Sequence, residues 1–167
     1  DGNSDDGSYE IIKEYEDKID ILIREKDEGL YDALNKGISI STGDFIGLLH
    51  SDDIYSSKNV ISEIVSSIKG NEIDCVLSNV RYMNINGKKS LRKLKALNFK
   101  SWMMRFGWMP PHLGMFIKKK VFDDYGFYLK DFKISADFEF VVRVLIKERI
   151  SYKAIDLTSV LMRKGGK

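Results

Sequence analysis

Two kinds of hydrophobic pattern alternate along the first half of this chain, and the alternation restricts the possible folds more than any other feature. Segments with apolar side chains at helical spacing are separated by short apolar runs that read as strands. In chain order these segments are residues 8–18, 20–25, 29–41, 44–49, 57–70 and 74–84. Strands that alternate with helices predict an α/β fold, in which helices flank a mostly parallel sheet.

Three local patterns sharpen this prediction. The apolar run DFIGLL (44–49) is almost continuous, which is typical of a strand that is covered on both faces. Ser8 is expected to be the N-cap of the first helix. The letters NING (84–87) predict a hairpin turn that leads into a strand within KKSLRKL (88–94).

The second half of the chain is less regular. Its clearest element is a helix at 135–149, with an apolar face that includes Phe138, Val141 and Leu145. The other expected elements are a short helix in 99–107, a loop, strand and short helix in 110–126, and strands in 151–155 and 159–163.

Composition limits the class of protein. A chain of 167 residues fits a single domain, residues 1–167, with a core of its own. The net charge of +2 argues against a nucleic-acid partner, which requires a strongly basic surface. Cys75 is the single cysteine and can form no internal disulfide, so we expect a cytoplasmic location. No apolar run approaches the ~18 residues of a membrane span.

Two carboxylates follow the strand expected at 44–49. Ser51, Asp52 and Asp53 lie where that strand ends, and ligands of open α/β sheets bind at the carboxyl ends of the strands. Two adjacent aspartates can bind Mg²⁺ together with substrate phosphates. They can equally form the entry turn of a helix, whose positive end favours acids. The pattern leaves both readings open.

Four other stretches carry polar groups that admit two readings each. Asp137 stands in the first turn of a helix, either as a stabilising N-terminal acid or as a general base. His112 follows two prolines and is either a structural hydrogen-bonding residue or a ligand contact. The polar stretch 25–37 is either a solvated helix face or part of a site. The basic, glycine-rich tail 162–167 either closes over phosphates or is a disordered end.

These stretches together resemble the family 2 glycosyltransferases, which have the GT-A fold. DGNSDDGS resembles the family's aspartate-rich loop, and EKDEGLYDALNKG followed by TGD and HSDD is similar to its most specific pattern. PPHLGMFIKKKVF resembles the segment before the acceptor region, and SADFEFVVRVL the helix that carries the base. The motifs lie at residues 1–8, 25–37, 42–44, 50–53, 110–122 and 135–145.

The resemblance implies a role for each motif position. Asp52 corresponds to the metal-binding end of the family's D-x-D motif and contacts the nucleotide sugar through the cation, Mn²⁺ or Mg²⁺, with Asp53 beside it. Asp137 corresponds to the catalytic base. The remaining expected contacts are Asp1 near the nucleotide base, Asp27 and Asn35 beside the nucleotide, and His112 and Arg163 near the diphosphate or acceptor.

The chain departs from the family pattern in two places. His50 stands where the family often has aspartate or asparagine, which affects ribose or metal contacts at that position. Family members also carry a strand, a helix and a second strand before the DGNSDDGS loop. We therefore expect the chain to be N-terminally incomplete relative to the family, with a GT-A-like sheet that lacks these elements.

The implied activity is an inverting transfer of sugar from a nucleoside-diphosphate sugar to a hydroxyl of a glycan or lipid-linked acceptor, in polysaccharide or glycan biosynthesis. Residues 1–90 would form the nucleotide-sugar and metal half, and 91–167 the acceptor half with the base. Peripheral association with the cytoplasmic face of a membrane and homo-oligomerisation are compatible with this activity. The alternatives are a sugar-1-phosphate nucleotidyltransferase and a non-catalytic nucleotide-binding domain. Aromatic residues at 99–108 either stack on sugars or pack against the core or a partner.

Overall fold

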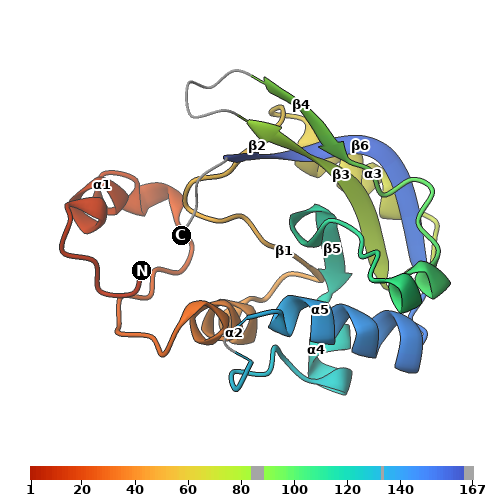
Figure 1. Ribbon diagram of the computed structural model, residues 1–167. Helices are drawn as coiled ribbons and strands as arrows, with labels where there is room; N and C mark the ends of the chain where they lie inside the picture. The colour runs from red at the N-terminus through yellow and green to blue at the C-terminus, as the bar shows by residue number, and fades with distance from the viewer. Residues whose placement is uncertain (84–88, 133, 164–167) are drawn as a thin grey trace.

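The computed structural model describes residues 1–83, 89–132 and 134–163, which form one curved mixed sheet with helices on both faces (Figure 1). The strands follow the order β1-β5-β3-β6-β2, and β4 pairs with β3. Their bounds are β1 Phe45–Gly47, β2 Ile54–Tyr55, β3 Cys75–Met83, β4 Lys89–Leu94, β5 Met115–Lys118 and β6 Tyr152–Arg163. The turn expected at 84–87 lies outside the described residues.

The α/β class is confirmed, but the prediction of a mostly parallel sheet is wrong. Among the described strands only β3 and β6 pair in parallel, whereas β1–β5, β3–β5, β3–β4 and β2–β6 are antiparallel. A parallel neighbour requires a long crossover connection, and the chain makes such a connection between β3 and β6. The two strands expected at 151–155 and 159–163 form the single strand β6.

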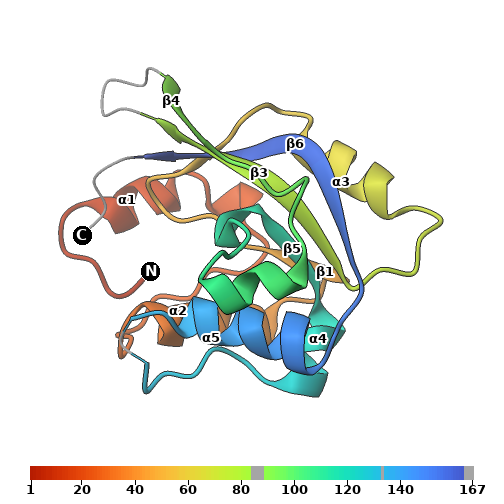
Figure 2. The same ribbon diagram turned by 45° about the vertical axis from the view of Figure 1, so that its right-hand side comes forward.

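The side chains of β3 and β5 alternate between two apolar layers, as the period of a strand requires. Cys75, Leu77 and Ile117 belong to the layer with α2 (Leu30–Ile40), α4 (Lys119–Tyr125) and α5 (Ala136–Val142). Val76 and Phe116 face α3 (Val60–Ile68) on the other side. Figure 2 shows α3 on the opposite side of the sheet from α5. The burial of Cys75 as a core thiol follows from its place in this layer.

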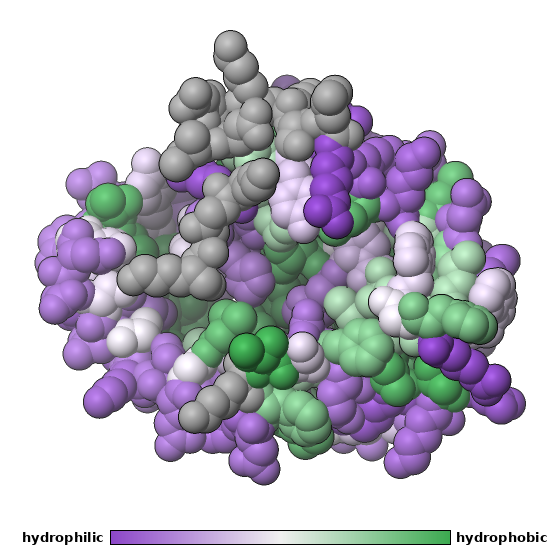
Figure 3. All heavy atoms as spheres, viewed as in Figure 1, coloured by the Kyte–Doolittle hydropathy of each residue, from purple (hydrophilic) through white to green (hydrophobic). Residues whose placement is uncertain are grey.

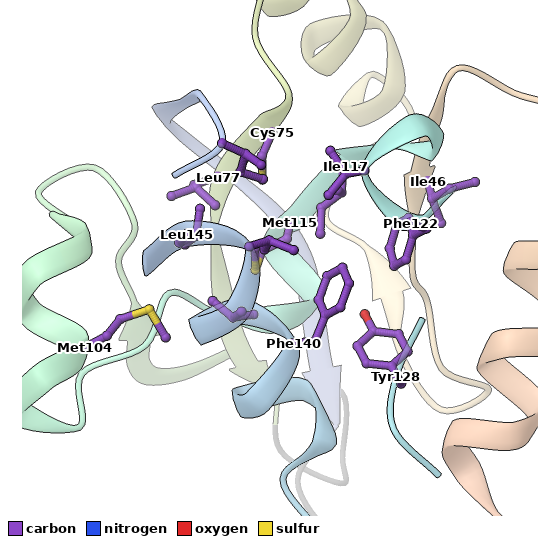
Figure 4. Packing of buried hydrophobic residues seen from close by; sticks show 14 of the residues in the cluster. Ile46, Cys75, Leu77, Met104, Met115, Ile117, Phe122, Tyr128, Phe140 and Leu145 are labelled. Carbon is purple, nitrogen blue, oxygen red and sulfur yellow. The ribbon is translucent and has the colours of Figure 1, made fainter. Parts of the chain in front are cut away.

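Aromatic rings fill the centre of the larger layer (Figure 4). Phe122 and Phe140 stack with ring centroids 4.8 Å apart, and Tyr128 lies 4.9 Å from Phe140. All three residues are buried. The apolar face predicted for the last helix is shifted, because Phe140 and Val144 are buried while Phe138 is only partly so. The α-helix ends at Val142 and continues as a π-helical turn, Arg143–Lys147.

Several expected elements differ from the structure at their ends. The first helix is α1 (Ser8–Lys13), followed by a 3₁₀ turn at Glu16–Lys18. Its N-cap is Gly7 rather than Ser8, because Ser8 is already the first helical residue. The Ser8 N–H donates to the carboxylate of Asp6. The helix expected at 99–107 is a 3₁₀ helix, η2 (Ser101–Phe106). The loop expected before the strand in 110–126 contains a second 3₁₀ turn, η3 (His112–Gly114), which leads directly into β5.

The strand expected at 20–25 does not form. The N-terminal amine of Asp1 donates to the Ile23 carbonyl at 2.9 Å, and the Glu25 N–H donates to the Asp1 carbonyl at 3.2 Å. This is the bonding of one parallel bridge, and no described strand continues it. A cavity of about 890 Å³ separates this segment from the outer edge of β1. No helix among the described residues is both long and apolar enough to cross a membrane.

Gly114 allows η3 to pack directly on β3. A Cβ atom at Gly114 would overlap the carbonyl oxygen of Ser78, whose hydroxyl donates to the Gly114 carbonyl at 2.8 Å. We expect Gly114→Ala to lower the free energy of unfolding by about 1–3 kcal/mol, because the backbone cannot move aside. Chemical denaturation measures this change.

Gly37→Ala is the matched control. Gly37 lies inside α2, and a Cβ atom there would meet nothing within 4 Å. The alanine should raise the free energy of unfolding by about 0.4–1 kcal/mol, because it restricts the unfolded chain. Equal effects of the two substitutions would contradict the close packing of η3 on β3.

Candidate active site

The turn after β1 separates the two adjacent aspartates. The Asp53 N–H donates to the His50 carbonyl at 3.1 Å, which closes the turn. The buried Asp53 carboxylate accepts the Arg163 N–H at the end of β6, at 2.9 Å. The Asp52 carboxylate forms no hydrogen bond or ion pair with any other described residue. Asp53 therefore holds the turn against the sheet, while Asp52 remains available to a ligand.

Burial raises the pKa of Asp53, and the hydrogen bond from Arg163 opposes that rise. The neighbouring charge of Asp52 raises the pKa further. A cation beside this pair would relieve both effects, because it would compensate the two negative charges.

The turn fits a divalent cation whose coordination shell is completed by a ligand. Within the described ranges, no group of three or more His, Cys, Asp or Glu side chains is arranged to hold a metal. Mg²⁺ sites commonly use only one or two carboxylates, together with substrate phosphates and water. Asp52, which has no partner among the described residues, would supply one such carboxylate, beside Asp53, whose carboxylate already accepts the Arg163 N–H.

Asp137 lies in the first turn of α5 and contacts α2. The Tyr31 hydroxyl donates to Oδ1 of Asp137 at 3.2 Å. Burial raises the pKa of Tyr31, and the negative charge of Asp137 adds to the effect. Tyr31 is therefore a neutral phenol at neutral pH. Its hydrogen bond orients the Asp137 carboxylate through Oδ1 and does not involve Oδ2.

Tyr128 joins three parts of the site. Its backbone is bound twice by Asn35, whose Nδ2 donates to the Tyr128 carbonyl at 2.8 Å and whose Oδ1 accepts the Tyr128 N–H at 3.1 Å. The Tyr128 hydroxyl lies 2.7 Å from Nε2 of His112. In this structure Asn35 is thus a contact between α2 and the loop before α5, and its predicted place beside a nucleotide stays a prediction.

His112 begins η3 and contacts Tyr128. Burial lowers the pKa of His112 to about 4. The charge of Asp137 acts against this change, whereas the charge of His50 adds to it. Both regions are therefore within electrostatic reach of one imidazole, which is neutral at pH 7. Tyr128 contacts both His112 of η3 and Phe140 of α5, and Leu48, just before the turn after β1, packs on the same apolar cluster as Leu113 of η3.

Asp1 and Asp27 form a second group. Both residues line a cavity of about 220 Å³, and a Cβ atom on Gly2 would lie 2.5 Å from Oδ2 of Asp27. The Asp1 carboxylate accepts the Ser4 hydroxyl at 2.6 Å and lies 3.5 Å from Nε of Arg24. His112, Asp52 and Asp137 are not in the lining of this cavity.

Arg163 ends β6 beside the turn after β1. Its backbone is fixed by Asp53, and its side chain is exposed. The rest of the glycine-rich stretch, residues 164–166, lies outside the described part of the chain. The predicted approach of Arg163 to a diphosphate stays a prediction.

Sequence reasoning missed an ion cluster around the buried Asp32 of α2. Asp32 is buried and accepts the Glu28 N–H at 3.0 Å. It forms ion pairs with Lys36 at 3.0 Å and Lys130 at 3.1 Å. These contacts lower the pKa of Asp32 well below its usual range. Lys130 thereby ties the loop before α5 to α2, and only the spacing of Asp32 and Lys36 could have indicated part of this cluster.

The sequence and the fold both match known glycosyltransferases. The sequence model of the family Glycosyl transferase family 2 matches residues 1–130. An uncharacterized glycosyltransferase of Mycobacterium tuberculosis is 27% identical over 156 residues, which cover 93% of this chain and 59% of the relative. A PGL/p-HBAD biosynthesis glycosyltransferase of Mycobacterium bovis is 26% identical over 148 residues, covering 86% of this chain and 55% of the relative.

Solved structures show the same architecture at lower sequence identity. Residues 1–349 of TarS from S. aureus, in complex with UDP-GlcNAc, superpose with a TM-score of 0.72 at 17% identity, covering 100% of this chain and 49% of that TarS fragment. The mannosyltransferase PcManGT from Pyrobaculum calidifontis, in complex with GDP-Man and Mn²⁺, gives 0.63 at 16% identity, covering 98% and 46%. The fold is therefore the GT-A-like fold of these enzymes.

Because the family model covers most of its length, the chain belongs to glycosyltransferase family 2. The chain spans between half and two thirds of the length of these curated relatives.

The environment of His112 predicts a pH dependence of stability. Its pKa is about 4 in the folded chain and close to the ordinary 6.5 when unfolded. As the pH falls through this interval, the unfolded state binds a proton that the folded state does not. The free energy of unfolding should decrease by up to about 3 kcal/mol between pH 7 and pH 4 on this account.

Chemical denaturation across this interval should show a weaker acid-side decrease for His112→Asn than for the unchanged chain. His50→Asn is the control, because it removes the only other histidine. A decrease of equal size in all three proteins would contradict the assigned environment of His112.

Proposed function

We propose that this chain forms the donor-binding and catalytic region of a glycosyltransferase. The reaction transfers a sugar, with inversion, from a nucleoside-diphosphate sugar to an acceptor hydroxyl. The observation that carries the proposal is that Tyr31 orients Asp137 at the start of α5, while Asp52 has no partner among the described residues in a turn that Asp53 holds against β6. Family membership and two structural neighbours with bound nucleotide sugars support it.

Asp137 is the proposed general base. Inversion requires a single displacement, in which the acceptor hydroxyl attacks the anomeric carbon and loses its proton. Oδ1 of Asp137 is oriented by Tyr31, so Oδ2 is the proposed proton acceptor. A positioned general base typically contributes ~10²–10⁴-fold to a rate.

The turn after β1 is the proposed cation site. Asp52 would be the principal ligand of Mn²⁺ or Mg²⁺, with Asp53 beside it. A bound cation stabilises negative charge on a leaving diphosphate. Mn²⁺ is present in the structure of PcManGT. Asp53 retains its contact with β6, so the cation would be held on a fixed part of the sheet rather than on a free loop.

The cavity between Asp1 and Asp27 is the proposed place of the nucleotide. These carboxylates can accept hydrogen bonds from a base or a ribose. Asn35 is proposed to act by fixing α2 beside that cavity, and Arg163 to approach the diphosphate. The acceptor is proposed to be a glycan or a lipid-linked glycan, in polysaccharide or glycan biosynthesis. A cytoplasmic location and self-association complete the proposal.

Replacing Asp137 separates catalysis from binding. Asp137→Asn keeps an oxygen that accepts from Tyr31 but removes the base. We expect the initial rate of sugar transfer to fall by ~10²–10⁴-fold, with the affinity for the nucleotide sugar unchanged. A panel of nucleotide sugars, assayed for transfer and by calorimetry, measures both quantities.

The matched control is Asp123→Asn, which removes an exposed carboxylate that pairs with Lys119 on α4. This variant should retain normal transfer. Near-normal sugar transfer by Asp137→Asn would exclude Asp137 as the general base. Cation-dependent nucleotide binding without transfer by the unchanged protein would instead favour a non-catalytic nucleotide-binding domain.

A further inference from the structure

Residues 97–108 display large apolar side chains to solvent. Phe106 is 81% exposed, Trp102 56%, Leu97 47% and Trp108 45%. Figure 3 shows hydrophobic side chains gathered on the right of the molecule, where η2 lies in Figure 1, with hydrophilic side chains at their edge. A concentration of exposed apolar groups on a folded domain usually marks an interaction surface.

The exposed rings are held in place by buried neighbours. Phe99 and Met104 are buried beneath the segment. The Ser101 N–H donates to the Tyr152 hydroxyl at 3.1 Å, which joins the start of η2 to β6. Trp108 stacks on Phe99 with ring centroids 6.1 Å apart. The segment is thus anchored on one side while its other side faces outward.

Trp102 and Phe106 form the outer part of this surface. Their rings meet edge to face with centroids 6.1 Å apart. Burial of this pair in the core would require the anchored helix to turn over, and that would expose Met104. The outward position of the two rings is therefore a fixed property of η2.

Positive charge surrounds these rings without negative charge nearby in the sequence. Residues 75–122 contain eleven Lys or Arg residues and no Asp or Glu, although the whole chain has a net charge of only +2. Lys95, Lys100 and Arg105 are exposed within or beside η2. Neither Lys100 nor Arg105 forms an ion pair with a carboxylate of the described residues. The surface therefore combines aromatic rings with uncompensated cations.

We propose that this surface, Lys95–Trp108, binds the surface of an anionic lipid membrane. Tryptophan rings are favoured at the boundary between lipid headgroups and acyl chains, and phenylalanine can enter the acyl region. Lys and Arg are attracted to anionic headgroups. The chemistry of both parts of the surface is complementary to such a membrane.

A second copy of the chain fits this surface less well. A two-fold dimer through η2 would bring Lys100 and Arg105 of both copies into one contact. Like charges would then face each other in an apolar contact, which is unfavourable. Bases of a single-stranded nucleic acid can also stack on exposed rings, but the net charge of +2 is far from the strongly basic domain that such a partner requires.

The surface lies away from the candidate active site. η2 packs against the π-helical turn Arg143–Lys147, at the end of the last helix that is opposite Asp137. Membrane binding through η2 would leave the region around His112 accessible. The inference does not depend on the proposed sugar transfer, and binding to lipid can be measured without any nucleotide.

Vesicle sedimentation tests the proposal. The chain should bind vesicles that contain phosphatidylglycerol and phosphatidylcholine but not vesicles of phosphatidylcholine alone, and added salt should weaken the binding. We expect the double variant Trp102→Ser and Phe106→Ser to bind at least about tenfold more weakly, with a similar loss for Lys100→Gln combined with Arg105→Gln. Thermal unfolding verifies that each variant remains folded.

The matched control is the double variant Ile11→Ser and Tyr15→Ser, which removes exposed apolar side chains at the α1 end of the molecule. It should bind the anionic vesicles normally. The proposal is overturned by absence of binding to these vesicles, or by unchanged binding of both η2 variants. Self-association that is lost in the Trp102 and Phe106 variant, without vesicle binding, would assign the surface to a second copy.

Discussion

The buried side chain of Tyr128 and its hydrogen bonds hold the candidate site together. Two bonds to Asn35 fix the backbone of Tyr128 on α2, and its hydroxyl fixes His112 in η3. Its ring packs against Phe140 of α5, the helix that begins with the proposed base. Three segments that are far apart in the sequence are therefore positioned by one residue. Tyr31 completes the arrangement, because it joins α2 directly to Asp137.

The end of β6 fixes the other part of the candidate site, which is the turn after β1. The backbone of Arg163 is bound by Asp53, so the turn that carries the proposed cation ligands is attached to the longest strand of the sheet. β3 lies beside β6 in parallel and carries η3 on its surface, where Gly114 permits close contact with Ser78. The polar groups of the proposed site are therefore fixed by secondary structure.

The sequence predicted the elements whose signal is local, and it failed where partners decide the outcome. The periodicity of residues 29–41 identified α2, and the apolar run at 74–84 identified β3, because those patterns are set by the faces that they bury. Residues 20–25 have a strand pattern but form no strand, since their bonding to Asp1 amounts to a single bridge. The antiparallel pairings join strands that are far apart in the sequence, and the pattern within each strand does not indicate which strand it pairs with. Tyr128 carried no signal for the same reason: its importance comes from Asn35 and His112.

The central claim is that the turn after β1 and the beginning of α5 lie around one ligand. Nuclear magnetic resonance of the isotope-labelled chain, titrated with Mn²⁺ and a nucleoside diphosphate, tests this claim directly, because the paramagnetic ion broadens signals from nearby nuclei. The account predicts that the amide signals of both Asp52 and Asp137 broaden when diphosphate and Mn²⁺ are present together, while those of α1 remain sharp. Broadening at Asp52 without any effect at Asp137, or no broadening at either residue, would contradict the account.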